Sequence, residues 1–487
     1  MTRSSAKERW RRTVIIRREA RGMGVMKESW KLIVCALLLS FGVVASLFSG
    51  IGIMMAVCVL LAVLVFLLDF NKIEYALWIG IVVTSFFGSY LGLPGNNSVF
   101  LFRILLLLHV PLFLWKLSRN RIGYSKMEKV IVILIVCWLF GNVASMLWAN
   151  YISATFRYLY FVFEAGYLIL ITLYHVRSKK DLMVLTYFIS AVYGFCLVIG
   201  LIEVLTGWHM SLSGNVLEYT QERHKYRPAG LQYNYNDFGA FLVMFLPLVV
   251  WGINTWKWHV KYVFIVAAVG LSGFLVINTY SRVSMVIWII EVVLLLILWF
   301  RVWGVIASVI GLLAIVSVNV LHLGAENSSL FTDVVSAFTE KGGSTNERLM
   351  MYQKTLQIIN ESHFLGVGVG NVPIELNNSI MGHGTMDNAY RAPHNFILET
   401  VGNIGLWSFF LFAVIVMVLI LSLKYLFVHM KYGFFAVVPV LIMAEFLSAS
   451  VGISTIIEIR FLWISFGIAL AIVSNQAFWR RDGEWDF

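Results

Sequence analysis

The stretch Ser284–Phe300, which reads SMVIWIIEVVLLLILWF, decides the fold of the chain. About seventeen almost wholly apolar residues are long enough to cross the roughly 30 Å hydrocarbon core of a bilayer as a helix. Similar runs recur along the whole chain, which is 60% hydrophobic and 13% charged, whereas soluble domains rarely exceed half apolar residues. We therefore predict an all-α polytopic membrane protein with about 14 transmembrane helices, in a range of roughly 12 to 14.

The expected spans divide the chain into membrane blocks and one large polar insertion. The spans lie at roughly 32–50, 52–69, 76–92, 99–117, 129–148, 158–175, 183–205, 238–254, 260–278, 284–300, 303–321, 403–424, 432–450 and 461–475. The first two are either separate spans or one re-entrant pair. The predicted blocks are a basic cytoplasmic tail at 1–31, eleven spans with an external loop 206–237 at 32–321, a large extracytoplasmic loop at 322–402, three spans at 403–475, and a cytoplasmic tail at 476–487.

The basic residues predict the orientation. With the N-terminus inside, about 26 of the 37 Lys and Arg fall on the cytoplasmic side, which is the positive-inside bias of membrane proteins. Both termini are then expected to be cytoplasmic. The net charge of +11 reflects this bias and a tail suited to anionic lipid, and we expect no nucleic-acid partner.

Neither disulfides nor a processed leader is expected. The four cysteines, Cys35, Cys58, Cys137 and Cys196, all lie inside apolar runs and form no CxxC pair, so thiolate metal sites are not predicted either. The basic stretch Arg3–Lys31 is too long for the n-region of a cleavable signal.

A polar stretch of about seventy residues, His322–Asn395, interrupts the membrane pattern, and loops this long in compact proteins are usually functional or disordered. Ser344–Glu347 matches a capping box, so a helix over 345–360 is expected, with Leu349, Tyr352, Leu356 and Ile359 at helical spacing. Gly366–Gly370 predicts a flexible turn. It lacks the Lys-Ser/Thr ending of a nucleotide-binding loop. Residues 377–390 are expected to form a mobile lid or a sugar-contacting loop.

Charged residues predicted on the outer face gather around this loop. Four arginines, Arg227, Arg282, Arg348 and Arg391, flank or lie within it, and the planar guanidinium suits bidentate binding of pyrophosphate. His394, beside Arg391, is either a general base, given an ordinary pKa near ~6.5, or an interfacial histidine. Each arginine taken alone is also explained as a snorkelling or solvent-exposed residue with no role in binding.

Acidic residues inside or at the ends of spans are exceptions to the apolar pattern. Charges in a membrane are costly and often functional. They are Glu164, Glu203, Glu291, Glu445 and Glu458. Glu445 and Glu458 are expected near the outer ends of the last two spans, facing one cavity. Glu291 indicates either ion coupling or, like the others, a pairing with Ser or Arg inside the bundle.

The ordered motifs over roughly 220–410 resemble those of the O-antigen ligase and Wzy-type polysaccharide polymerase superfamily. The matching segments are Arg227-Pro-x-Gly230, Tyr280-Ser281-Arg282-x-Ser284, Glu347-Arg348, Phe364-Leu-Gly-x-Gly368-x-Gly370 and Arg391-x-x-His394-Asn395-x-x-Leu398 followed by Gly402-x-x-Gly405. Asn236-Asp237 stands where the family often has Pro-Asn, and Val283 replaces a small residue.

The resemblance implies a fold like that of the GT-C membrane glycosyltransferases. It also implies a reaction on polyprenyl-pyrophosphate-linked glycans at the outer face of the cytoplasmic membrane of a bacterium. It implies an inverting transfer without metal or other cofactor, with His394 and Arg282 as catalytic residues. Its implied substrate-binding residues, with the two outer acids added, are Arg227, Arg348, Arg391, Asn395, Tyr280, Ser281, Asn236, Glu445 and Glu458.

Several functions stay open at this point. A cell-surface polysaccharide polymerase, of the teichuronic acid or exopolysaccharide kind, is favoured over a ligase to a lipid or wall acceptor. A transporter or lipid-linked glycan flippase is the rival class, although the two halves of the chain show no internal repeat. The expected partners are the lipid-linked glycan donor, a glycan or lipid acceptor, membrane lipid, and a chain-length regulator or flippase.

Overall fold

The protein is described by a computed structural model over residues 70–93, 96–119, 123–217, 225–320, 342–381, 392–430, 433–453 and 455–479. This part of the chain is helical apart from one short hairpin, so the all-α prediction is confirmed in its main feature. The expected spans 32–50 and 52–69 lie outside the described residues, and so does Arg391. The described chain divides into two compact units, residues 1–118 and 119–487.

The first unit contains two predicted spans joined by a hairpin that the sequence did not indicate. Helix α3 (Phe70–Phe87) and a 3-10 turn (Gly88–Leu91) lead into antiparallel strands β1 (Gly92–Leu93) and β2 (Asn96–Phe100), and α4 (Leu101–Arg119) follows. The buried Glu74 of α3 pairs with His109 and Lys116 of α4. The two helices are therefore joined by charge as well as by apolar contact.

The second unit holds the remaining helices. They are α5 (Lys126–Ala144), α6 (Ile152–His175), α7 (Lys179–Thr206), α8 (Gly214–Leu217), α9 (Tyr235–Asn254), α10 (Lys261–Asn278), α11 (Arg282–Phe300), α12 (Val302–Val320), α14 (Gly342–Glu361), α15 (Val372–Met381), α16 (Phe396–Ile404), α17 (Ser408–His429), α18 (Val438–Gly452) and α19 (Arg460–Ser474). Across both units, 10 helices in the described ranges are long and apolar enough to cross a membrane. Two shorter apolar helices, Val302–Gly311 and Arg460–Ser474, stand at further predicted spans. The total of about 14 stays a prediction.

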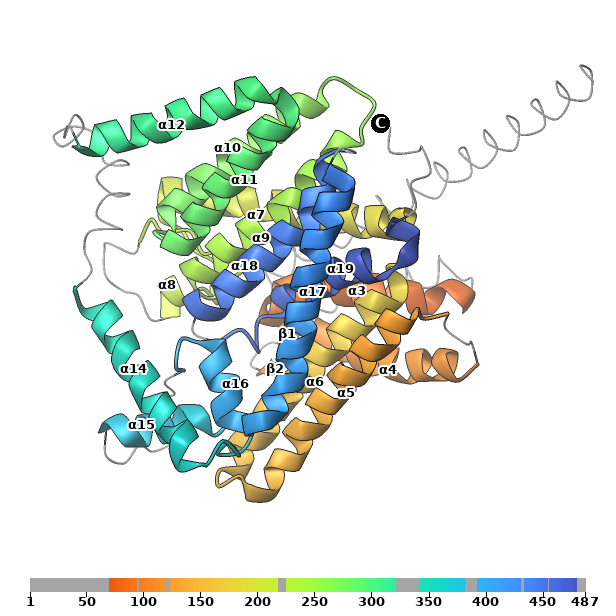
Figure 1. Ribbon diagram of the computed structural model, residues 1–487, viewed down its shortest axis with the longest axis vertical. Coiled ribbons are helices and arrows are strands. Elements are labelled where there is room, and N and C mark those ends of the chain that lie inside the picture. Colours follow the sequence, from red (N-terminus) through yellow and green to blue (C-terminus); the bar gives the residue numbers. More distant parts are fainter. Residues whose placement is uncertain are drawn as a thin grey trace, which may run out of the picture. The chain divides into compact units, whose positions relative to one another are not determined.

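Helix α9 forms the centre of this unit (Figure 1). Its residues from Phe238 to Ile253 are buried all round, which is typical of a helix enclosed by others. It packs against α7, α10, α11 and α18. The start of α9 therefore fixes the relative positions of the loops that precede α9 and α11.

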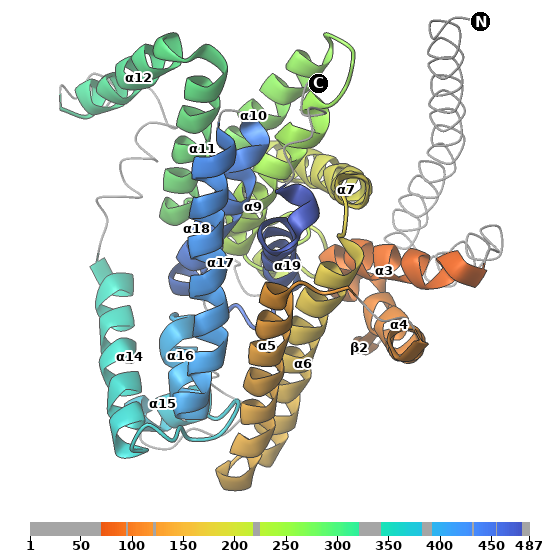
Figure 2. The ribbon, with the colours of Figure 1, turned by 45° about the vertical axis from the view of Figure 1, so that its right-hand side comes forward.

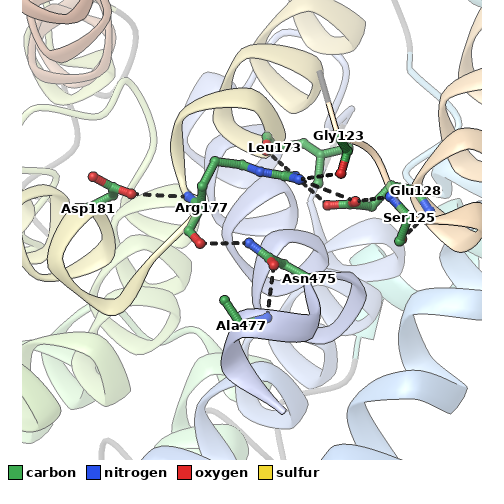
Figure 3. Close-up of polar contacts among 8 residues, drawn as sticks. All are labelled: Gly123, Ser125, Glu128, Leu173, Arg177, Asp181, Asn475 and Ala477. Carbon is green, nitrogen blue, oxygen red and sulfur yellow. Dashed lines mark hydrogen bonds and ion pairs between the residues drawn. The ribbon is translucent and has the colours of Figure 1, made fainter. Parts of the chain in front are cut away.

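A polar cluster joins one end of α5, α6, α7 and α19, as Figure 3 shows. The Arg177 guanidinium pairs with Glu128, whose side chain is only 1% exposed. The Arg177 backbone N–H donates to Asp181 Oδ2 at 3.3 Å, and its carbonyl oxygen accepts from Asn475 Nδ2 at 2.9 Å. One arginine thus fastens helices that are distant in sequence.

Replacing Arg177 with alanine is expected to destabilise the protein by about 3 kcal/mol, because it leaves the buried Glu128 carboxylate without its cation. Thermal unfolding of the purified protein in detergent, followed by circular dichroism, measures the loss. The exposed Lys180, on the first turn of α7, gives the control, and Lys180→Ala should leave the midpoint almost unchanged. Equal midpoints for Arg177→Ala and wild type would show that the cluster contributes no stability.

The large loop forms a helical layer of its own. Helices α14, α15 and α16 pack on one another beside one end of α17 (Figures 1 and 2). Met351, Ile358 and Leu376 form a small hydrophobic core between α14 and α15. The predicted helix over 345–360 is confirmed. However, it begins at Gly342, so Ser344 lies inside it and the expected capping box at Ser344 is wrong.

The buried face of α14 also differs from the expected one. Of the expected residues, Ile359 is buried, whereas Leu349 and Leu356 are 55% and 52% exposed, and Met351, Thr355 and Ile358 are buried instead. Helical spacing in the sequence indicates an apolar stripe along α14. The helix carries two such stripes side by side, and the spacing does not show which of them is buried. The contacts with α15 and α16 decide which of them is buried.

The predicted span 403–424 is a broken helix. Helix α16 starts already at Phe396, and a 3-10 turn over Gly405–Trp407 separates it from α17. Gly405 has a φ of 56°, and a side chain there would lie 2.0 Å from the Phe364 carbonyl oxygen. The break therefore lets the 362–366 turn approach the backbone, which only glycine permits.

Candidate functional site

The glycine-rich turn Gly366–Gly370 anchors the loop layer to the connection between α5 and α6. The Trp148 indole donates to the Gly366 carbonyl at 2.9 Å, and Thr155 Oγ1 donates to the Val369 carbonyl at 3.0 Å. Asn371 Oδ1 accepts the Tyr151 backbone N–H at 2.7 Å. The predicted turn is present, and its glycines permit positive φ values and close packing against these partners.

This anchor lies at the opposite end of the α5–α6 pair from Arg177. Helix α5 ends at Ala144 and α6 begins at Ile152, next to the anchor, whereas Glu128 and His175 mark their other ends. This arrangement fits the prediction that the loop and the Arg177 cluster lie on opposite faces of the membrane. The expected loop over 377–390 is partly helical, since α15 extends to Met381, and residues 382–391 lie outside the described ranges.

His394 stands at the junction of the loop layer and α16. Its backbone is in the left-handed region, with a φ of 53°, which is uncommon for a residue with a side chain and often marks a functional constraint. Its Nδ1 atom is buried and has no hydrogen-bond partner among the described residues. Burial first, and then the positive charge of Arg348, lower the pKa of His394 to about 4. The imidazole is therefore neutral at physiological pH, because its pKa lies below the unperturbed value near ~6.5.

Helix α14 supplies the residues that surround His394. The Tyr352 hydroxyl donates to the His394 carbonyl at 3.1 Å. Arg348, one turn earlier, donates through Nη2 to the carbonyl of Gly452 at 3.3 Å, at the C-terminal end of α18. Arg348 thus links the loop layer to the membrane bundle while its charge acts on His394.

Arg227 and Tyr280 come together from two separate connections of the bundle. The Arg227 guanidinium carbon lies 4.2 Å from the centre of the Tyr280 ring and 5.2 Å from that of Tyr235. Cation–π stacking of this kind orients the plane of an arginine. Tyr280 also has a positive φ, 58°, so two predicted site residues hold a strained backbone.

Arg282 lies two residues after Tyr280, as the first residue of α11, and the adjacent side chains are tightly packed. The Ser281 and Ser284 hydroxyls are 3.0 Å apart. A side chain at Gly239 of α9 would lie 2.9 Å from Ser284 Oγ, and one at Gly452 would lie 3.4 Å from Val283. The start of α11 therefore lies between the start of α9 and the end of α18.

These contacts form a continuous path through the predicted site. It runs from Arg227 to Tyr280 by stacking, along the chain to Val283, and across to Gly452, which accepts from Arg348. Tyr352, one turn after Arg348 on α14, then bonds the His394 carbonyl. Motifs that are more than 160 residues apart in sequence are brought to one region. The position of Arg391 lies outside the described residues and stays a prediction.

Other predicted site residues have structural roles. Asn395 caps α16, because its Oδ1 accepts the N–H groups of Ile397 and Leu398 at 3.0 and 3.1 Å. Asn236 donates its own N–H to the Asn234 side chain, at the start of α9. These bonds set the helix starts beside the site.

The two outer acids, Glu445 and Glu458, make different contacts. Glu445 is 1% exposed, accepts from Ser448 at 3.2 Å, and interacts electrostatically with Glu291 of α11. Glu458 instead pairs with Arg157 at 3.8 Å. Glu164 pairs with Arg460, which confirms for this residue the predicted pairing of a membrane acid with Ser or Arg inside the bundle.

A buried carboxylate beside His394 was missed by the sequence analysis. Glu399 of α16 is fully buried and accepts hydrogen bonds from the Tyr158 hydroxyl at 2.8 Å and from Thr455 at 3.2 Å. Its place five residues after His394 is visible in the sequence. Its partners on α6 and before α19 are not.

Comparison with known proteins gives a family match and one curated relative. A profile of the O-antigen ligase family matches residues 267–413, which include Tyr280, Arg282, Arg348 and His394. The resemblance to the O-antigen ligase and polymerase superfamily is therefore confirmed. The family implies a glycosyltransferase-like enzyme of polysaccharide biosynthesis in a multi-pass membrane protein.

One curated relative covers most of the chain. The teichuronic acid biosynthesis protein TuaE of Bacillus subtilis (strain 168) is 24% identical over 413 residues, which are 80% of this chain and 81% of the relative. No solved structure matches the chain significantly.

Proposed function

We propose that this protein is an inverting, metal-independent polysaccharide polymerase that uses a polyprenyl-pyrophosphate-linked glycan at the outer face of the cytoplasmic membrane. The proposal is supported by the contacts that link the segments bearing Arg227, Arg282 and Arg348, and by a neutral His394 on which the charge of Arg348 acts. Arginines suit a pyrophosphate, and a neutral imidazole can accept a proton.

The proposed chemistry is a single displacement at the anomeric carbon of the donor glycan. The acceptor hydroxyl oxygen forms the new bond to this carbon and gives its proton to His394. The bond from the carbon to the pyrophosphate oxygen breaks, and polyprenyl pyrophosphate leaves with the electron pair. Arg227 and Arg282 stabilise the leaving group as it forms, and Arg348 holds the glycan or the pyrophosphate.

The lowered pKa of His394 has a consequence for the donor. Arg348 is a cause of the lowering, so a bound pyrophosphate, which neutralises arginine charge, should raise the pKa again. His394 would then become a stronger base only when the donor is in place. This coupling protects the free site from protonation and favours reaction in the complex.

The pH dependence of transfer tests this assignment. The acid limb of kcat/KM, which reports the free enzyme, is expected near the His394 pKa of about 4 and not near ~6.5. The acid limb of kcat should lie at higher pH, because it reports the donor complex. Rates measured with saturating and limiting donor separate the two limbs, and coincident limbs near pH ~6.5 would contradict the assignment.

A polymerase and a ligase differ in their acceptor. The name of the relative TuaE refers to the synthesis of a teichuronic acid, which is a repeating polymer, and this favours the polymerase. Purified protein supplied only with a lipid-linked repeat unit should yield products of two or more repeats, counted by mass spectrometry. Transfer of single units, and only onto an added lipid or wall acceptor, would support a ligase instead.

A further inference from the structure

The turn that carries Arg227 is held by a buried carboxylate from another helix. Glu203, in the last turn of α7, is fully buried. Its Oε2 accepts the backbone N–H groups of Ala229 at 2.8 Å and Gly230 at 2.7 Å. Burying a carboxylate is costly unless hydrogen bonds and charge compensate for the lost water. The two amides supply part of that compensation.

The Arg227–Gly230 turn is also held by close packing against α9. Gly230 has a φ of 56°, and a side chain there would lie 2.5 Å from the Phe238 ring. Pro228, Ala229 and Gly230 are all buried. The turn is therefore pressed against α9 on one side and fixed to α7 on the other.

His209 completes the surroundings of Glu203. Its Nδ1 lies 3.2 Å from Glu203 Oε1, and its Nε2 lies 2.7 Å from the Lys225 carbonyl oxygen. Both ring nitrogens thus face oxygens that only accept hydrogen bonds, if Glu203 is ionised. A neutral imidazole has one N–H and can serve only one of them, whereas the imidazolium has two. The geometry therefore selects the doubly protonated ring.

The neighbouring charges agree with this form. Burial by itself lowers the pKa of His209, but the contacts with Glu203 and with the Lys225 carbonyl outweigh it and raise the pKa above 6.5. The Lys225 ammonium group lies against the Tyr226 ring, 5.6 Å from its centre. Cys196 of α7 interacts electrostatically with Glu203. Within the described ranges, Glu203 is thus the charged side chain that acts on the His209 ring.

We propose that Glu203 and a doubly protonated His209 are positioning residues, which hold the Arg227–Gly230 turn so that Arg227 stays stacked on Tyr280 and binds the donor pyrophosphate. The link to the donor rests on the proposed function, whereas the holding of the turn is independent of it. Lys225, whose carbonyl His209 binds, lies two residues before Arg227, so the imidazolium fixes the approach to the turn and Glu203 fixes its end.

The sign of the pH effect follows from the direction of the shift. A histidine whose pKa is raised by folding contributes stability below its unfolded pKa and loses it as pH rises through the folded value. The turn should accordingly be held at pH 6 to 6.5 and loosen as pH rises through the His209 pKa. Glu203 keeps its two amide bonds throughout, so the turn loosens and does not unfold.

Hydrogen–deuterium exchange of the full-length protein in detergent tests the holding of the turn. After correction for the intrinsic pH dependence of exchange, a peptide containing Ala229 and Gly230 should lose about tenfold protection between pH 6 and pH 9 in wild type. Glu203→Gln keeps an oxygen for the two amides and an N–H for a neutral His209, so its protection should not vary with pH. Glu203→Ala should exchange faster at every pH.

The matched control is His363→Asn, an exposed histidine that contacts only a carbonyl of its own turn, and it should keep the wild-type transition. Equal pH dependence in wild type and Glu203→Gln would overturn the protonated pair. Unchanged exchange in Glu203→Ala would overturn the holding of the turn. Because Glu203→Gln conserves shape, the test stands even if the alanine variant fails to fold.

The link to the donor is tested with a polyprenyl-pyrophosphate-linked glycan in proteoliposomes. The KM for this donor should rise about tenfold from pH 6 to pH 9 in wild type and stay level in Glu203→Gln, with kcat less affected. Identical KM profiles in the two proteins, despite different exchange profiles, would overturn the link to the donor. Absence of transfer by wild type at every pH would instead overturn the proposed function, and the exchange result would stand.

Discussion

Replacing His394 with asparagine is expected to lower kcat for glycan transfer by about 10²–10⁴-fold while the protein remains folded, which is the usual loss when a general base is removed. Asparagine tolerates the left-handed backbone that His394 adopts, and its amide cannot take a proton from the acceptor hydroxyl. Donor affinity should change little, because the arginines remain. Initial rates at several donor concentrations measure both quantities.

His363→Asn is the matched control for this variant. His363 also has a positive φ, 50°, and is exposed, so the same substitution there tests the effect of an asparagine in this backbone conformation without the proposed base. It should transfer glycan at the wild-type rate. Normal transfer by His394→Asn would show that His394 is not the base.

Replacing Arg282 with glutamine is expected to lower kcat by about 10²–10³-fold, which is the effect of removing one group that stabilises charge in a transition state. The pyrophosphate gains negative charge as the glycosidic bond breaks, and a neutral amide compensates for it poorly. Arg282→Lys should recover part of the rate, since it keeps the charge but not the planar pair of donors.

The control for Arg282 lies at the other end of the same helix. Arg301 is exposed and follows the last residue of α11, so Arg301→Gln removes one positive charge from that helix away from the proposed site. It should leave kcat unchanged. Equal losses in Arg282→Gln and Arg301→Gln would mean that charge on α11 supports the fold and not the reaction.

The sequence was sufficient to predict the membrane helices, because a span is defined by its own length and apolar composition. Runs such as 238–254 and 284–300 match α9 and α11 within a few residues. Features set by tertiary contacts were predicted less well. The break at Gly405 depends on the approach of the Phe364 carbonyl, and the buried face of α14 depends on α15 and α16.

In the candidate site, too, the residue types could be predicted from the sequence, whereas their spatial arrangement could not. The residue types of Arg227, Arg282, Arg348 and His394 and their order indicated an anionic ligand and a family. Their convergence arises from stacking on Tyr280 and from the Gly452 contact, between segments that no local pattern connects. The lowered pKa of His394 and the pairing of His209 with Glu203 depend on burial and on neighbours distant in sequence, so they could not be predicted from the sequence.

Transfer by purified protein in proteoliposomes, with a polyprenyl-pyrophosphate-linked repeat unit as the only substrate, tests the central claim most directly. The account predicts new glycosidic bonds and released polyprenyl pyrophosphate in equal amounts, in the presence of a metal chelator, with both products lost in His394→Asn. Movement of the intact lipid-linked glycan across the bilayer, with no glycosidic bond formed, would contradict the account and identify a flippase.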